Sequence, residues 1–363
     1  MKAILMLEDG KGFSGEAISA GPEKIGEVVF NTAVVGYQEM LTTPANAGKI
    51  LVFTYPLIGN YGCAPKFNES HAVWPCGLVI KEKSRIVSNW QATQSLDDFI
   101  KEHNLSTITK VDTRTLAVHL RQKSQIHMLG IISTSCFDAK ELVAKIKDSR
   151  KVPQPSFLPG ISVKKITTLK TSKPKAKKIA VLDLGVTKSI LRQLEALGFF
   201  VTLLPYGTGT ADIVRLKPLG LVISDGPEED PGLQEVVQNI KPLIGVLPVL
   251  AISTGHQVLA RALGGQVSRM HLGHRGVNYP VRDPLSWKGE ITVQNHGHVV
   301  EAYSLQKIKE VKITARNSND QTIEEIESRR LKFIGVQYYP ASPGFDEVHP
   351  AFIRFANMIN RSI

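Results

Sequence analysis

A buried strand, a sharp turn and an amphipathic helix are predicted in succession for Leu247–Gly265. The apolar run ends at Ile252, Ser253 lies in the turn, and Val258 begins the apolar face of the helix. In such an elbow the side chain at 253 stands exposed at a helix N-terminus, where the helix dipole stabilises developing negative charge. Ser253 is therefore a candidate nucleophile. The alternative is an ordinary strand-to-helix turn in which Ser253 only caps the helix.

Three further segments with polar or glycine residues come after predicted strands. Ser224–Pro227 follows an apolar strand and could present backbone amides. Gln294–Gly297 follows the run Ile291–Val293, and Gly335–Pro340 ends another strand. Because sites in doubly wound sheets collect at the carboxyl ends of strands, we expect these segments to line one pocket with Ser253.

The elements that would position this pocket lie in the second half of the chain. From residue 179 onward buried strands such as Ile179–Leu184 alternate with amphipathic helices, the first opening at Thr187 and closing at Gly198. This rhythm predicts an α/β domain over residues 179–363 with a doubly wound, mostly parallel sheet.

The first half of the chain has a different pattern. Short apolar runs such as Ile50–Phe53 alternate with turn-rich segments, and one helix is predicted near Ser95–Glu102. Residues 1–162 are therefore expected to form a β-rich α+β domain. The lysine-rich stretch 163–178 lacks helical periodicity and is interpreted as an exposed linker between the two domains.

Length and composition agree with two folded domains. A chain of 363 residues is long for one domain, and 42% hydrophobic with 21% charged residues excludes a disordered or fibrous protein. The net charge of +11 fits a solvated surface, with an anionic partner as the alternative. No stacking aromatic residues accompany the lysine-rich stretch, so we expect no nucleic-acid binding.

Several sequence features favour the cytoplasm. Cys63, Cys76 and Cys136 form neither a CxxC pair nor an even disulfide framework, which favours a reducing compartment. The N-terminal segment lacks the apolar core of a signal peptide, and no run of 18 apolar residues predicts a membrane helix. We therefore expect a cytoplasmic protein that does not enter a membrane.

Motifs along the whole chain connect it to a known family. LEDGKGF, GYQEMLTTP, TYPLIGNYG, VDTRTL, GHQ, QNHG and ASPG occur in this order. In these motifs the chain resembles the small subunits of carbamoyl-phosphate synthase, which are class I glutamine amidotransferases. The resemblance implies that the first domain docks on a large synthetase subunit. The second would hydrolyse glutamine and pass ammonia through a tunnel to carboxyphosphate, which is made from bicarbonate and ATP.

The same resemblance carries expectations about cofactors and pathway. ATP and magnesium are implied only for the large subunit, so this chain is expected to hold no cofactor. Its complex would supply carbamoyl phosphate to arginine or pyrimidine synthesis.

The chain departs from the family where the chemistry is done. The family reads GICLGHQ with a nucleophilic cysteine, whereas this chain reads AISTGHQ with Ser253 at that position. The family reads HPE, its base and orienting acid, before ASPG; here Tyr339 takes the base position and the acid has no counterpart. The second glycine of the family's NGPG is Glu228, a serine of the pocket wall is Ala45, and the aromatic residue after QNHG is His298.

These changes predict an inactive glutaminase. A cysteine at a helix N-terminus beside a histidine readily becomes the thiolate that attacks an amide. Serine needs a base, and a tyrosine hydroxyl, with an ordinary pKa of about 10, is mostly protonated at neutral pH. Losing one member of such a unit can cost up to about a million-fold. A carboxylate at Glu228 would also repel the oxyanion of the reaction.

Some candidate binding residues are retained. Gly226, Gln257, Asn295 and Gly297 stand where the family contacts glutamine, so we expect glutamine to bind weakly at most. The alternative is that they persist as turn and packing residues. We expect no metal, since no carboxylate or cysteine joins the histidines at ligand spacing; these are His271, His274, His296 and His298.

Three hypotheses of function follow. The first is a carbamoyl-phosphate synthase small subunit whose glutaminase is disabled and whose large subunit takes free ammonia. The second is a working glutamine-hydrolysing chain with an unusual mechanism centred on Ser253. The third is a non-enzymatic protein repurposed to bind an anion or RNA, for which affinity should fall steeply with salt.

Overall fold

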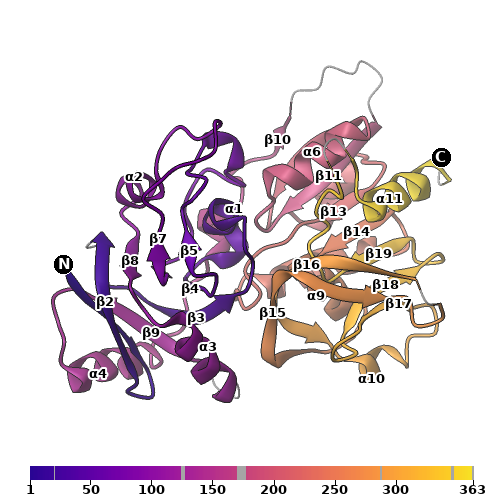
Figure 1. The fold of residues 1–363 in the computed structure, drawn as a ribbon. Helices are drawn as coiled ribbons and strands as arrows, with labels where there is room; N and C mark the ends of the chain where they lie inside the picture. Colours follow the sequence, from indigo (N-terminus) through magenta and orange to yellow (C-terminus); the bar gives the residue numbers. More distant parts are fainter. Residues whose placement is uncertain (20, 124–126, 170–176, 287, 345–346, 362–363) are drawn as a thin grey trace. The chain divides into compact units, whose positions relative to one another are not determined.

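The computed structural model describes all residues except 20, 124–126, 170–176, 287, 345–346 and 362–363. The described chain divides into two compact units, Met1–Gln154 and Pro155–Ile363 (Figure 1). No helix in this described part is long and apolar enough to cross a membrane.

The division between the units falls before residue 162, where the sequence placed the end of the first domain. Helix α5 (Leu158–Ile161) groups with the second unit because Leu158 is fully buried in that unit's core. The Asp230 carboxylate also accepts the Leu158 backbone N–H at 3.1 Å. Within the stretch 163–178, Thr167–Thr168, Lys177 and Lys178 belong to strands of the second unit, and residues 170–176 lie outside the described residues, so a linker role for these stays a prediction.

The first unit is built around a closed barrel with the strand order β1-β2-β8-β6-β4-β3-β9. Apolar side chains from different strands, among them Leu5, Val52 and Ile108, pack in one buried cluster. A separate two-stranded sheet pairs β5 with β7. The strands are β1 (Lys2–Leu7), β2 (Gly12–Ser19), β3 (Ile25–Asn31), β4 (Lys49–Phe53), β5 (Leu57–Ile58), β6 (Gly77–Val79), β7 (Glu82–Lys83), β8 (Ser106–Thr109) and β9 (Leu129–Ser133).

Helix α2 confirms the helix predicted near Ser95–Glu102. The Ser95 hydroxyl accepts the Asp98 backbone N–H at 3.1 Å and so caps the helix. Further helices surround the barrel, in keeping with the expected β-rich α+β class. The helices of this unit are α1 (Tyr37–Thr42), α2 (Leu96–Glu102), α3 (Thr113–Gln122) and α4 (Ala139–Ser149), with short 3₁₀ turns at Pro44–Asn46 and Pro65–Phe67.

The second unit contains one sheet with the order β10-β12-β11-β13-β14-β19-β18-β17-β15-β16. Strands β12, β11, β13, β14 and β19 pair in parallel, and the remaining pairs are antiparallel. The strands are β10 (Thr167–Thr168), β11 (Lys177–Asp183), β12 (Phe199–Pro205), β13 (Leu221–Ile223), β14 (Val249–Ile252), β15 (Val267–Arg282), β16 (Gly289–Val300), β17 (Lys312–Asn317), β18 (Ile323–Ser328) and β19 (Phe333–Val336).

Helices cover both faces of the parallel strands (Figure 1). Successive residues alternate between the faces: Leu182 packs in the cluster with α8 and α9, whereas Val181 packs with α6 and α11. This is the doubly wound α/β arrangement that the sequence predicted. The helices are α6 (Lys188–Ala196), α7 (Thr210–Arg215), α8 (Leu233–Ile240), α9 (Thr254–Ala262), α10 (Ala302–Leu305) and α11 (Pro350–Asn360), with a 3₁₀ turn at Lys241–Leu243.

The antiparallel part of the sheet corrects one expectation. Gln294–Gly297 was expected to follow a strand, but it lies inside β16, which continues to Val300. Cross-strand pairs with β15, such as Asn295 with Arg275, hold this segment extended. Its polar residues therefore belong to a strand and not to a loop.

Candidate functional site

The predicted elbow is present at the end of β14. Ser253 connects β14 to α9 with φ 51° and ψ −108°, a left-handed conformation that costs energy in a residue with a Cβ. Its backbone N–H donates to the Val336 carbonyl of β19 at 2.7 Å, which fixes the turn. A Cβ on Gly255 would lie 2.3 Å from the Ile223 carbonyl oxygen, so only glycine lets α9 begin this close to β13.

Ser253 is not exposed as expected. Only 4% of the residue is accessible, and its side chain lies beside the buried carboxyl group of Asp225, which follows the neighbouring strand β13. The expectation of exposure was wrong because it ignored what the adjacent parallel strand places beside the elbow. An acid after β13, at the same sheet edge as Ser253, was the signal available in the sequence.

Asp225 also accepts backbone N–H groups, one from its own turn and one from the elbow. Its Oδ1 accepts the Gly226 N–H at 2.8 Å and the Thr254 N–H at 3.4 Å. Burial raises the pKa of Asp225 to about 6, although these hydrogen bonds and the Ser253 side chain act to lower it. At pH 7 this carboxyl group is therefore largely ionised, next to the position where an oxyanion would develop.

Glu228 is buried, with 6% of the residue accessible. Its carboxylate accepts the Gly297 N–H at 3.0 and 2.8 Å and the His298 N–H at 3.1 Å. The Gln257 side-chain amide donates to the same carboxylate at 2.9 Å. Two of the residues expected to contact glutamine, Gln257 and Gly297, thus already have Glu228 as a partner.

The remaining expected binding residues lie close by in the fold. The Gly226 carbonyl accepts the Thr254 hydroxyl at 2.6 Å, and a Cβ on Gly226 would meet the Leu184 carbonyl oxygen at 2.2 Å. Asn295 lies two residues before Gly297 on β16. Glutamine binding by these residues stays a prediction.

Tyr339, at the expected base position, has other partners than Ser253. Its hydroxyl hydrogen-bonds the hydroxyls of Thr187, at 2.5 Å, and Ser189 at the start of α6. Its backbone N–H donates to the Val293 carbonyl at 2.8 Å, which joins the segment after β19 to β16. The expected nucleophile and base positions therefore have different hydrogen-bond partners.

The imidazole of His298 lies between two carboxylates. Its Nε2 is 2.9 Å from Glu229 and its Nδ1 is 3.6 Å from Glu228. Burial lowers the pKa of His298, but the hydrogen bond to Glu229 and the charges of Glu228 and Glu229 outweigh this and raise it to about 9. An imidazolium is therefore held beside Glu228 at neutral pH.

A pH dependence of stability follows from His298. Its pKa is raised above the ordinary unfolded value of about 6.5, so its contribution is complete below that pH and lost as the pH rises through about 9. We expect the free energy of unfolding to fall by up to a few kcal/mol between pH 6.5 and 9.5. His274, whose pKa is also raised to about 9, titrates in the same range.

Urea unfolding of the wild type and of His298→Gln at several pH values separates the two histidines. The variant is expected to show the smaller loss, since only the His274 part remains. If the free energy of unfolding fell equally with pH in both proteins, the predicted role of His298 would be contradicted.

A second cluster corrects the expectation about the other histidines. Ligand atoms of His274, His296 and Glu324, all buried, lie within 4.8 Å of one another. The sequence interpretation that no carboxylate joins the histidines was wrong, because β17 and β18 bring Glu324 and Asp320 beside them. His274 Nε2 is 2.9 Å from Asp320, and His296 Nε2 is 2.7 Å from the Gln294 side-chain oxygen. These two ring nitrogens therefore have hydrogen-bond partners within the protein; the absence of a metal stays a prediction.

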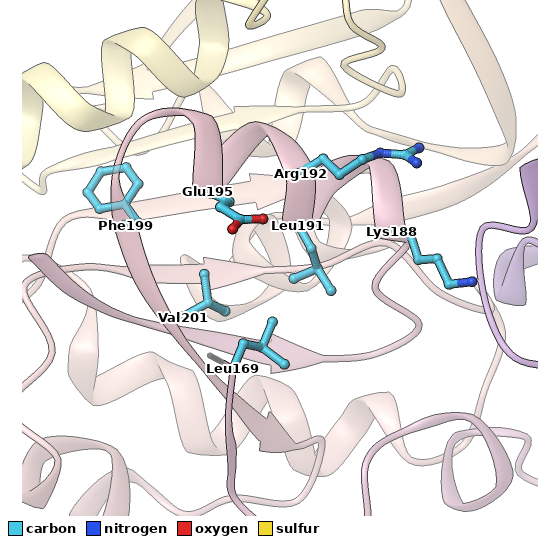
Figure 2. Close-up of a pocket in the computed structure, with 7 residues that line it drawn as sticks. All are labelled: Leu169, Lys188, Leu191, Arg192, Glu195, Phe199 and Val201. Atoms are coloured by element: carbon cyan, nitrogen blue, oxygen red, sulfur yellow. The ribbon is translucent and has the colours of Figure 1, made fainter. Parts of the chain in front are cut away.

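A hollow of about 250 Å³ lies beside α6, and its lining includes none of the predicted site residues (Figure 2). Figure 2 shows Lys188, Arg192 and Glu195 projecting from the helix. All three are exposed, and the rest of the lining is apolar, so these residues offer no buried polar group that would recognise a ligand. The lining residues are Leu169, Lys188, Leu191, Arg192, Glu195, Phe199 and Val201.

Comparisons with known proteins agree with both units. Residues 5–132 match the family model of the carbamoyl-phosphate synthase small chain, CPSase domain, and residues 180–355 match that of class I glutamine amidotransferases. The carbamoyl phosphate synthase small chain of Syntrophotalea carbinolica is 39% identical over 381 residues, covering 100% of this chain and 99% of the relative. The pyrimidine-specific small chain of Bacillus subtilis is 36% identical over 363 residues, covering 99% and 96%.

Solved structures align with about half of the chain. A glutamine amidotransferase from Thermotoga maritima has 16% identity and a TM-score of 0.35, covering 51% of this chain and 83% of the other. The glutaminase domain of Trypanosoma brucei CTPS with bound acivicin has 16% identity and a TM-score of 0.40, covering 51% and 94%.

The doubly wound sheet, the elbow and the matching domain model define the second unit as a class I glutamine amidotransferase domain. The full-length matches then place the whole chain: it belongs to the carbamoyl-phosphate synthase small chain family. Membership in this family implies a large synthetase subunit as its partner.

Proposed function

We propose that this small subunit does not hydrolyse glutamine and that its complex with a large subunit makes carbamoyl phosphate from free ammonia. The observation that carries the proposal is the neighbour of Ser253. The nucleophile position lies beside the Asp225 carboxyl group, which accepts the backbone N–H of Thr254 in the elbow and that of Gly226 after β13. An oxyanion formed there would compete with a carboxylate for its donors.

Two further features support the loss of hydrolysis. The Tyr339 hydroxyl is engaged with Thr187 and Ser189. The Glu228 carboxylate fills the part of the pocket next to Gln257 and Gly297. In this role the chain stabilises the large subunit or modulates it, without supplying ammonia.

One observation favours a second candidate, a working site built on Ser253. Asp225, with its pKa raised to about 6, lies beside Ser253 and could act as a general base near neutral pH. We rank this function second because the same carboxylate occupies the backbone amides of Thr254 and Gly226, the donors nearest Ser253 that a serine hydrolase would need for its oxyanion.

Reconstitution with the large subunit tests the proposal. Carbamoyl phosphate is measured with saturating glutamine or with ammonium, for the wild type and for Ser253→Ala. We expect synthesis from ammonium in both complexes, and synthesis from glutamine at the level given by its contaminating ammonia. Efficient use of glutamine that disappears in Ser253→Ala and in Asp225→Asn would instead support the second candidate.

A further inference from the structure

The carboxylate of Glu228 is bound in the way that a protein binds a free carboxylate ligand. Two consecutive backbone N–H groups, those of Gly297 and His298, donate to it at 2.8 to 3.1 Å. A side-chain amide, that of Gln257, donates at 2.9 Å. Backbone donors on one strand and an amide from helix α9 thus converge on one anion from different elements.

Charges around Glu228 also favour the ionised form of its carboxyl group. The His298 imidazolium lies 3.6 Å from it, and the charge of Glu228 acts to raise the pKa values of His296 and Arg261. The opposing charge is Asp225, whose pKa the charge of Glu228 helps to raise. Charge-assisted hydrogen bonds of this kind are the strong ones, so a buried carboxylate is stable here.

From this geometry we propose that Glu228 is an internal ligand: its side chain occupies a carboxylate-binding subsite of the pocket and excludes small carboxylate molecules from it. The inference deepens the proposed function and rests on it, since a pocket closed by its own side chain would keep an amino acid substrate out. Removing the side chain of Glu228, without any other change, would therefore open a subsite for a monocarboxylate.

Glu228→Gly creates this opening, and acetate is the probe. The melting temperature of the variant is expected to rise by about 3 to 6 °C at an acetate concentration ten times the dissociation constant. Chloride at equal ionic strength controls for salt. The wild type and Glu228→Gln, in which the subsite stays filled, are expected to show no acetate-specific rise.

Glu229→Gly is the matched control, because the carboxylate of Glu229 bonds His298 and Arg269 but none of the three donors that hold Glu228. It is expected to respond to acetate like the wild type. If Glu228→Gly and Glu228→Ala fold only when acetate is supplied, the inference is supported. If they fail to fold in acetate, or fold and respond to it no more than the wild type, the inference is overturned. Neither result requires glutamine hydrolysis, so the proposed function is decided separately by the reconstitution.

Discussion

Gly226→Ala is expected to destabilise the second unit by more than about 3 kcal/mol, a large part of the stability of an ordinary domain. A Cβ at this position would lie 2.2 Å from the carbonyl oxygen and 2.8 Å from the carbonyl carbon of Leu184. Both atoms belong to the main chain that follows β11, so no side-chain rotation relieves the contact. The ends of β11 and β13 would have to separate, and with them the turn that carries Asp225.

Urea unfolding measures the loss, and hydrogen exchange of peptides from β11 and β13 assigns it to this unit. Gly160→Ala is the control, because a Cβ there has no neighbour within 4 Å. It is expected to stay within about 1 kcal/mol of the wild type. A Gly226→Ala variant as stable as the control would show that the two strand ends are not packed as closely as described.

The parts of the fold that depend on local pattern could be predicted from the sequence. The strand ending at Ile252, the turn at Ser253 and the helix beyond it follow from apolar runs and helical spacing. The lengths of the antiparallel strands could not be predicted in this way, because β16 carries buried polar residues where an apolar pattern was expected. Gln294, His296 and His298 are all buried and alternate along that strand, a period of two made by polar side chains.

The contents of the pocket were less predictable because they depend on pairs of residues far apart in the chain. The sequence interpretation noted that Glu228 replaces a glycine, and expected repulsion. It did not anticipate that the carboxylate would find donors at Gly297 and His298, some 70 residues further on. It also missed Asp225 as the neighbour of Ser253, since only the order of the strands places the two residues side by side.

Ser253→Cys alone is expected to recover almost none of the factor of up to about a million that a nucleophile and its base supply together. The new thiol would lie beside the Asp225 carboxylate, which disfavours the thiolate. No base would serve it at position 339, where the tyrosine hydroxyl is bonded to Thr187 and Ser189. Glutamate release by this variant is therefore expected to stay within a few-fold of the wild type.

The reactivity of the thiol separates these causes. Combining Ser253→Cys with Asp225→Asn removes the charge next to the thiol. The pKa of the thiol is then expected to fall by about one unit or more relative to Ser253→Cys alone. Alkylation by iodoacetamide at pH 7 should become up to about tenfold faster. The wild type gives the background, which comes from the half-buried free Cys136, since burial raises the pKa values of Cys63 and Cys76 to about 12. Glutamate release should remain low in the double variant, since a more reactive thiol still has neither a base nor an open pocket. Rapid glutamate release by Ser253→Cys alone would mean that Asp225 and Glu228 move aside when glutamine binds, and that the cysteine was the one missing group.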